Sequence, residues 1–94
     1  MHIESVEIYS DATNAAVMRH PNRKFPGVLI QGDTLNSMFR ALDAVATHAR
    51  AQLDAESLSR LNDVRDRLQS LLRHYKTTLG DHQLSLPFTD VAGS

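Results

Sequence analysis

The stretch Phe25-Pro26-Gly27-Val28-Leu29-Ile30-Gln31-Gly32-Asp33-Thr34-Leu35 combines a turn, a short apolar strand, a second turn and a helix start. Pro26-Gly27 is typical of a turn, and the apolar run after it predicts a strand over 28–31. Gly32 permits a sharp exit from this strand. Asp33 is suited to cap the next helix, because its carboxylate can accept a backbone amide hydrogen. The junction therefore predicts a strand that leads directly into a helix.

Two more strands are expected upstream of this junction. Residues 3–9 alternate between the two faces of an extended chain and predict the first strand. Residues 10–14 supply turn chemistry, and residues 15–19 predict the second strand. A hairpin is the shortest connection between the two. Residues 20–24 then form a loop, because Pro21 lacks an amide hydrogen and favours extended geometry in the residue before it.

Two long helices are expected downstream. The first is predicted over 34–52 and the second over 55–79. Asp54 is suited to cap the second helix, and Gly80 to end it in a left-handed conformation. Apolar residues recur at helical spacing and predict one stripe on each helix. The stripes comprise Leu35, Met38, Phe39, Leu42, Ala46, Ala49 and Leu53 on the first helix, and Leu58, Leu61, Val64, Leu68, Leu71, Leu72, Tyr75 and Leu79 on the second.

These elements predict an α+β fold in a single domain over 1–94. A three-stranded antiparallel sheet is expected to pack against the two-helix hairpin, because the joint apolar stripe needs a cover. Leu84 and Leu86 alternate with polar residues, so a short fourth strand at 83–86 is the variant of this fold. Residues 89–94 are small and polar and are expected to form a flexible tail.

Composition excludes several classes of protein. Of the 94 residues, 41% are hydrophobic and 22% are charged, which is the balance of a globular protein. The net charge of −1 argues against nucleic-acid binding, which needs a basic excess. The chain has no cysteine, no apolar run long enough to span a membrane and no basic, apolar leader. We therefore expect a cytoplasmic protein with neither a nucleic-acid nor a membrane partner.

No pattern predicts catalysis, a cofactor or a metal. No two of the five histidines have the i, i+4 spacing of a helical metal pair. The serines lack a Gly-x-Ser-x-Gly elbow, and the glycines lack the spacing of a phosphate-binding loop. An enzyme would require His20, His74 or His82 beside a carboxylate in one cleft. We expect no catalytic residue, no metal ligand and no cofactor.

A basic cluster is the candidate binding site. It consists of Arg19, His20, Arg23 and Lys24, at one end of the predicted hairpin. The cluster is either an ordinary polar loop or a contact surface for an acidic patch on a protein partner. Nucleic acid ranks third, because no aromatic residue interleaves the cluster to stack bases. A second candidate is any part of the apolar stripe over 55–79 that the fold leaves uncovered, as a dimer or partner interface.

Residues 26–35, Pro-Gly-Val-Leu-Ile-Gln-Gly-Asp-Thr-Leu, resemble the signature of HicB-type antitoxin domains. That signature carries Pro-Gly, three residues, Gln-Gly-Asp-Thr and then an Ala-rich amphipathic helix. The spacing matches here, and the alanines that follow are Ala41, Ala44, Ala46 and Ala49. Residues 3–20 also fit in their strand–turn–strand order. More loosely, the chain resembles a group of small uncharacterised bacterial proteins with an Arg-Lys/Arg-Phe-Pro-Gly-Val-x-Ile-Gln-Gly-Asp core.

The resemblance implies a sheet-plus-helix domain that neutralises a toxin by binding it, usually a small RNA-cleaving one. Two departures matter. HicB-type proteins usually add a DNA-binding segment, for which this sequence ends too early, and residues 55–79 add a helix that the usual domain lacks. Toxin binding is therefore implied and operator binding is not. An immunity protein against a secreted bacterial toxin has the same features.

We therefore predict a non-enzymatic bacterial protein-binding module, an antitoxin or immunity protein that occludes a toxin. The 19–24 loop and an exposed sheet edge are the predicted contact surface, and a homodimer is compatible with the pattern. The alternative is a small-molecule-binding or dimeric regulator, which requires an apolar pocket between sheet and helices with a few inward polar groups. A pull-down from the native host and a thermal-shift screen with metabolites distinguish the two.

Overall fold

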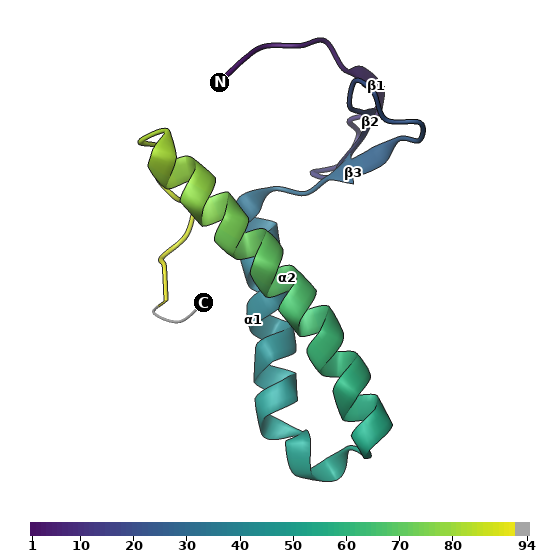
Figure 1. The fold of residues 1–94 in the computed structure, drawn as a ribbon, viewed down its shortest axis with the longest axis vertical. Helices are drawn as coiled ribbons and strands as arrows, with labels where there is room; N and C mark the ends of the chain where they lie inside the picture. The colour runs from purple at the N-terminus through teal and green to yellow at the C-terminus, as the bar shows by residue number, and fades with distance from the viewer. Residues whose placement is uncertain (92–94) are drawn as a thin grey trace. The chain divides into compact units, whose positions relative to one another are not determined.

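The computed structural model describes residues 1–91, whose backbone forms two compact units. Unit 1 is Met1–Gln31 and carries three strands, and unit 2 begins at Gly32 and carries two long helices (Figure 1). The α+β class, the three-stranded antiparallel sheet and the helix pair are confirmed. The packing of the sheet against the helices and the single domain over 1–94 stay predictions.

Unit 1 is an antiparallel sheet with strand order β1-β2-β3. The strands are β1, Glu7–Ser10; β2, Ala16–Arg19; and β3, Gly27–Leu29. The turn between β1 and β2 is held by Thr13, whose hydroxyl donates to the Ala15 carbonyl oxygen at 3.1 Å. β1 pairs irregularly between Ile8 and Ser10, which is the signature of a β-bulge.

The first strand is shorter than the predicted 3–9, because its neighbour ends too soon. Glu7 lies opposite Arg19, the last residue of β2. Any strand residue before Glu7 would need a partner at His20 or beyond, where Pro21 has no amide hydrogen and Asn22 has a positive φ of 69°. The alternating sequence over 3–6 therefore has no ladder to join.

Unit 2 is an antiparallel helical hairpin of α1, Gly32–His48, and α2, Ala55–Asp81, with a 3₁₀ turn η1, Arg50–Gln52, between them. Asp54 caps α2 as predicted, since its carboxylate accepts from the Ser57 amide at 2.7 Å. The predicted cap at Asp33 is displaced: α1 already begins at Gly32, and the Asp33 carboxylate accepts from the adjacent Thr34 amide at 2.9 Å.

The core of unit 2 lies between the two helices. Leu72 is fully buried, and it packs with Leu35 and Phe39 of α1 and with the partly buried Leu68 and Phe88. The predicted stripes supply this core, because their spacing keeps these positions on the facing sides of the helices. The stripes are not covered throughout: four apolar side chains of the helices stay about half exposed, namely Met38, Val45, Val64 and Leu71.

Gly32 allows the closest approach between the helices. A Cβ atom built on Gly32 would lie 2.2 Å from Cζ of Tyr75 on α2, far inside van der Waals contact. Gly27, in contrast, has no atom within 4 Å of such a position. The glycine in the Gln31-Gly32-Asp33 motif is therefore required by packing, and Gly27 is not.

The end of α2 differs from the prediction. The helix continues through Gly80 to Asp81, and the left-handed residue is Gln83, with φ of 59°. The Leu84 amide donates to the Leu79 carbonyl oxygen at 2.9 Å, and the Gln83 amide donates to that of Gly80 at 3.1 Å. This pair of bonds is a Schellman motif, which satisfies the last carbonyls without glycine at the left-handed position.

The predicted strand at 83–86 is absent, because these residues form the turn after α2 and then run without a strand partner. The chain instead folds back onto its own helix. The Phe88 ring stacks on Tyr75 with centroids 6.5 Å apart, and Lys76 donates to the Asp90 carboxylate at 2.9 Å. In the tail predicted over 89–94, Asp90 is thus tied to α2, and residues 92–94 lie outside the described residues.

Candidate functional site

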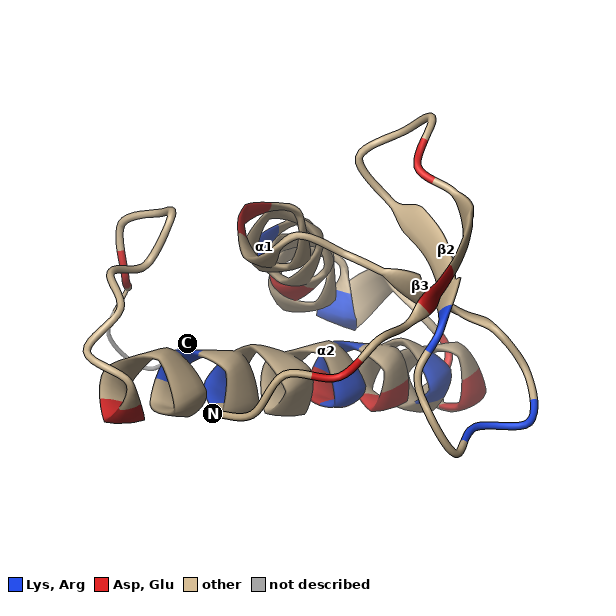
Figure 2. Cartoon of the chain, turned by 90° about the horizontal axis from the view of Figure 1, so that it is seen from above, with Lys and Arg blue, Asp and Glu red and all other residues tan. Residues whose placement is uncertain are grey.

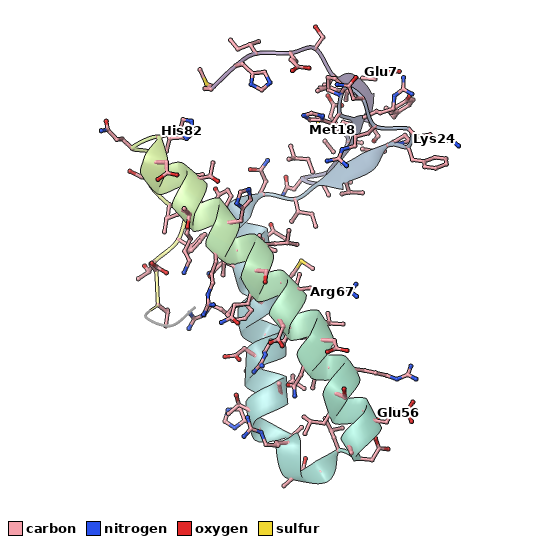
Figure 3. The ribbon with its side chains drawn as sticks, in the orientation of Figure 1. Glu7, Met18, Lys24, Glu56, Arg67 and His82 are labelled. Carbon is pink, nitrogen blue, oxygen red and sulfur yellow. The ribbon has the colours of Figure 1, made fainter. Side chains whose placement is uncertain are left out.

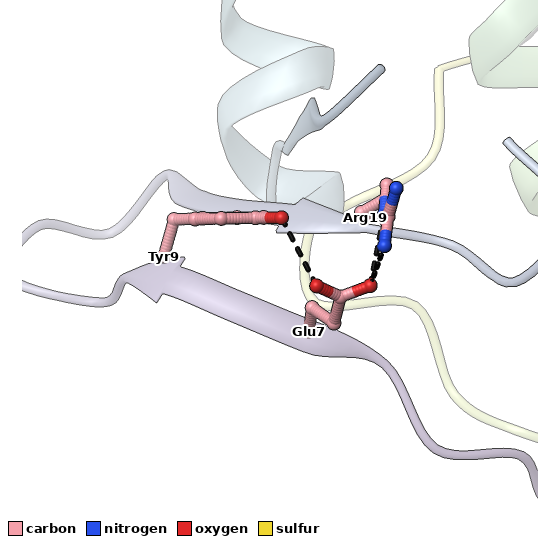
Figure 4. Close-up of polar contacts among 3 residues, drawn as sticks. All are labelled: Glu7, Tyr9 and Arg19. Carbon is pink, nitrogen blue, oxygen red and sulfur yellow. Dashed lines mark hydrogen bonds and ion pairs between the residues drawn. The ribbon is translucent and has the colours of Figure 1, made fainter. Parts of the chain in front are cut away.

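Arg19, the first residue of the predicted basic cluster, is bound within the sheet (Figure 4). Its guanidinium donates to the Glu7 carboxylate on β1, the Nε–Oε1 distance being 2.8 Å. The Tyr9 hydroxyl donates to the other Glu7 oxygen at 3.1 Å. The hydrogen bond from Arg19, followed by that from Tyr9, lowers the pKa of Glu7, and the same pairing raises the pKa of Arg19. The charge of Arg19 is therefore compensated internally.

Sequence reasoning did not find the roles of Glu7 and Tyr9. The available signal was their i, i+2 spacing, which puts both side chains on one face of an extended strand. The missing part was the register of the hairpin, which places Arg19 directly opposite Glu7. Opposite charges at directly opposed positions stabilise a sheet modestly. The guanidinium of Arg19 thus pairs two strands of the sheet, and this pairing limits what it can offer to a partner.

The loop after Arg19 is ordered by a tight turn. The Arg23 amide donates to the His20 carbonyl oxygen at 3.1 Å, and the two central residues are Pro21 and Asn22. Proline first and a positive-φ asparagine second are typical of a type II turn. The His20 ring nitrogen Nδ1 lies 2.9 Å from the Pro21 carbonyl oxygen, which can only accept, so Nδ1 carries the hydrogen.

Arg23 and Lys24 are the cations that the loop leaves exposed. Within residues 1–91, neither forms an ion pair with a carboxylate. Lys24 projects from the loop with its Nζ 5.4 Å from the centroid of the Phe25 ring (Figure 3). No acidic residue occurs over 12–32, so nothing local compensates these two charges.

Two hollows meet at this loop. One, of about 340 Å³, brings Arg19, His20 and Arg23 together beside Ser5 and Glu7. Lys24 does not line it. The other, of about 370 Å³, follows β3 and is mainly apolar; its lining comprises Met18, His20, Arg23, Phe25, Gly27, Val28 and Leu29. The predicted cluster is therefore assembled in part, with an apolar surface beside it that the sequence did not indicate.

The apolar surface continues across one face of the sheet. Ile8 lies opposite Met18, and Ala16 lies opposite Leu29, so the register puts all four on the same face. We call Ile8, Ala16, Met18 and Leu29 the apolar face. No side chain in residues 1–31 is buried, and Ile8 is 58% exposed. A small sheet is stabilised when one apolar face is covered, so the apolar face is a candidate contact surface.

The second candidate surface lies on unit 2. Val64 and Leu71 stand seven residues apart on α2, as Met38 and Val45 do on α1, and each pair shares a helix face. Lys and Arg are mixed with Asp and Glu over residues 56–67 of α2, whereas residues 68–80 carry two bases and no acid (Figure 2). The Glu56–Arg60 pair is formed at 2.7 Å as predicted, and Arg65 bonds Asp66. A hollow of about 570 Å³ lies at Leu71, and Asp66 and Arg67 border it with charges of opposite sign.

Three of the five histidines, His2, His20 and His82, have local partners. His82 Nδ1 lies 2.9 Å from the Thr78 carbonyl oxygen, and His2 Nε2 lies 2.8 Å from a Glu4 carboxylate oxygen. Across residues 1–91, no three metal-ligating side chains of His, Asp or Glu lie close enough to hold an ion. None of the helices in that same part of the chain has the length and apolarity to cross a membrane.

With this geometry in view, the comparison with known families is informative. The model of a family of unknown function, DUF6959, matches residues 1–88. The chain belongs to this family. The match spans the whole sheet, both helices and the returning segment up to Phe88. No curated protein and no solved structure matches the chain.

Proposed function

We propose that this chain is a non-enzymatic protein-binding module, and specifically an antitoxin or immunity protein that neutralises a bacterial toxin by covering it. One observation carries the proposal: the apolar face lies exposed beside two uncompensated cations, Arg23 and Lys24. An apolar patch rimmed by polar groups is typical of protein–protein interfaces. The resemblance of residues 26–35 to HicB-type antitoxin domains adds the class of partner.

We assign different roles to the apolar and the charged residues of the site, on the basis of their burial and charge. Ile8, Met18 and Leu29 offer desolvation, which supplies most of the free energy of association. Arg23 and Lys24 at the rim steer a partner that carries carboxylates and speed its approach. Arg19 contributes little new attraction, because the Glu7 carboxylate already binds its guanidinium. Neutralisation is then steric, since the module covers the toxin's working surface without reacting with it.

The test is binding to a defined toxin. Each gene that flanks this one is co-expressed with it, and relief of growth arrest identifies the partner. Replacing Arg23 and Lys24 together by glutamate should weaken binding on the order of tenfold or more in calorimetry. The matched control is Arg50→Glu, the same charge change on the exposed η1 turn of unit 2. Equal affinity of both variants, or absence of any partner that the chain rescues, contradicts the proposal.

A small-molecule regulator is the second candidate, and the hollow along β3 favours it. Its volume of about 370 Å³ is within the range of ligand sites, and its lining is mainly apolar with His20 and Arg23 as polar groups. A rise in the thermal midpoint with one metabolite, abolished by Met18→Asp, would support this candidate. We also propose a cytoplasmic location, which agrees with a chain that has no cysteine; fractionation of the host tests it.

A further inference from the structure

Among the described residues, the outer edge of β3 has no neighbouring strand, and residues 3–6 pair with no strand. β3 is the last strand of the order β1-β2-β3, so its outer row of amide and carbonyl groups has no strand partner. Residues 3–6, Ile-Glu-Ser-Val, fall within the predicted strand over 3–9 but lie outside the ladder. Ile3 is 89% exposed. We propose that residues 3–6 of a second copy of this chain add to the β3 edge as a fourth strand.

The two sheet edges differ in a way that selects β3. The β1 edge carries Glu7 and a bulge, and both features discourage the addition of a strand. The β3 edge is short and regular, and residues 25–31 contain no charged side chain. An uncharged apolar edge strand is the form that accepts another strand most readily. Val28, in its middle, is 59% exposed.

The chemistry of residues 3–6 matches that edge. Ile3 and Val6 are apolar and lie on opposite faces of an extended segment, so each face of the segment brings one apolar side chain to the edge, where Val28 and Leu29 also lie on opposite faces. Glu4 brings a carboxylate to an edge bordered by Arg23, a cation without a carboxylate partner among the described residues. Within one copy, the Glu4 carboxylate lies 2.8 Å from Nε2 of the exposed His2. Charge and hydrophobicity are therefore complementary between the segment and the edge.

The segment of the same copy cannot take this place. Residue 6 leads directly into β1, and β2 separates β1 from β3. To reach the outer side of β3, three strand spacings of ~4.8 Å must be crossed, which uses about four extended residues at ~3.3 Å each. Too few residues of 3–6 then remain to form a ladder. A second copy has no such restriction, and a twofold arrangement lets each copy give its segment to the other.

Disulfide trapping tests the contact directly, because the natural chain has no cysteine. A Ser5→Cys chain is mixed with a differently tagged Val28→Cys chain and oxidised glutathione, which is reduced to two thiols as one interchain disulfide forms. Ser5 and Val28 are the central positions of segment and edge. The control pairs Ser5→Cys with Ser59→Cys on the exposed side of α2. The proposal expects the first heterodimer to form at least about tenfold faster than the control; equal rates overturn it.

Light scattering over a concentration series provides the second measurement. The mass should rise from that of one 10.5 kDa chain to that of two. Ile3→Lys should raise the dissociation constant at least about tenfold, whereas Leu84→Lys, an exposed leucine of unit 2, should leave it unchanged. A single-chain mass throughout, or a dimer that survives Ile3→Lys and is lost in Leu71→Lys, overturns the proposal. Toxin binding is measured separately, so a monomer that still binds a toxin leaves the proposed function intact.

Discussion

The two units of this chain differ in how far they bury their apolar side chains. In unit 2, Leu72 is completely buried between the helices, and Phe88 packs against the same core. Unit 1 has a comparable density of apolar residues, yet none of its side chains is buried. The hairpin therefore has its own hydrophobic core, whereas the sheet depends on what it contacts. The difference teaches that the hydrophobic core lies in the hairpin, and that the apolar residues of the sheet stay at the surface of unit 1.

The strongest test of this comparison contrasts one side chain from each unit. Leu72→Ala should lower the free energy of unfolding by about 2–5 kcal/mol, because it leaves a cavity in the core. Ile8→Ala on the apolar face should cost at most about 1 kcal/mol, because Ile8 is already exposed. Urea denaturation followed by circular dichroism measures both. If the two substitutions cost the same, Ile8 is buried in solution and the comparison fails.

The glycines of the 25–35 stretch sharpen the comparison, since one belongs to each unit. Gly32→Ala should destabilise by about 1–3 kcal/mol, because the added methyl displaces the Tyr75 ring and with it the Phe88 stack. Gly27→Ala should stay within about 0.5 kcal/mol of the natural chain, because its surroundings are open. Thermal unfolding of the two variants in parallel decides the matter, and a large loss for Gly27→Ala would count against the open β3 edge.

A smaller effect is expected at the end of the hairpin. Gly80 lies inside α2 with nothing within 4 Å of a Cβ position. Gly80→Ala should therefore stabilise the chain by about 0.5–1 kcal/mol through helix propensity alone. The measurement is the shift of the thermal midpoint. A loss of stability would show that the Schellman turn at Gln83 needs the flexibility of the glycine before it.

The smallest effects concern one carboxylate in each unit. Hydrogen bonds from Ser57, its amide first, lower the pKa of Asp54 below 3.8, and Arg19 and Tyr9 lower the pKa of Glu7 below 4.5. Both pKa values are depressed by folding, so both contributions are complete above the unfolded values and are lost as pH falls through the folded ones. NMR titration should find both groups below their ordinary values.

The matched variants separate the two causes. Arg19→Gln should raise the pKa of Glu7 more than Tyr9→Phe does, because the guanidinium is its first partner. Neither change should move the pKa of Asp54, whose partner is on α2. A coupled shift of both carboxyls would mean that the units are not electrostatically independent.

Local signals predicted the helices well. Asp54 and the spacing of the apolar residues define the hairpin, because caps and amphipathic stripes depend on neighbours within a few residues. The strand at 3–9 was overlong because its length depends on where β2 ends, which is twelve or more residues away in the sequence. The end of α2 was misplaced because Gln83 adopts a left-handed conformation that glycine usually takes.

The sequence predicts which basic residues lie at the candidate site, but it does not predict which side chains they pair with. Residues 20–24 form a loop as expected, and its turn follows from Pro21-Asn22. The register that places Arg19 opposite Glu7 depends on tertiary structure, and it pairs one of the four residues of the predicted basic cluster with a carboxylate. The apolar face was hidden for the same reason, because three strands contribute to it and no single strand displays it.

The placement of the aromatic hydroxyls has a practical consequence. The chain has no tryptophan and two tyrosines, with Tyr9 in the sheet and Tyr75 in the hairpin. Each unit therefore carries a native spectroscopic reporter of its own: Tyr9 is hydrogen-bonded to a carboxylate, and Tyr75 stacks on Phe88. Replacing either by phenylalanine leaves an emission signal from one unit alone. Partner capture and unfolding can then be followed separately in the same small molecule, without any attached dye.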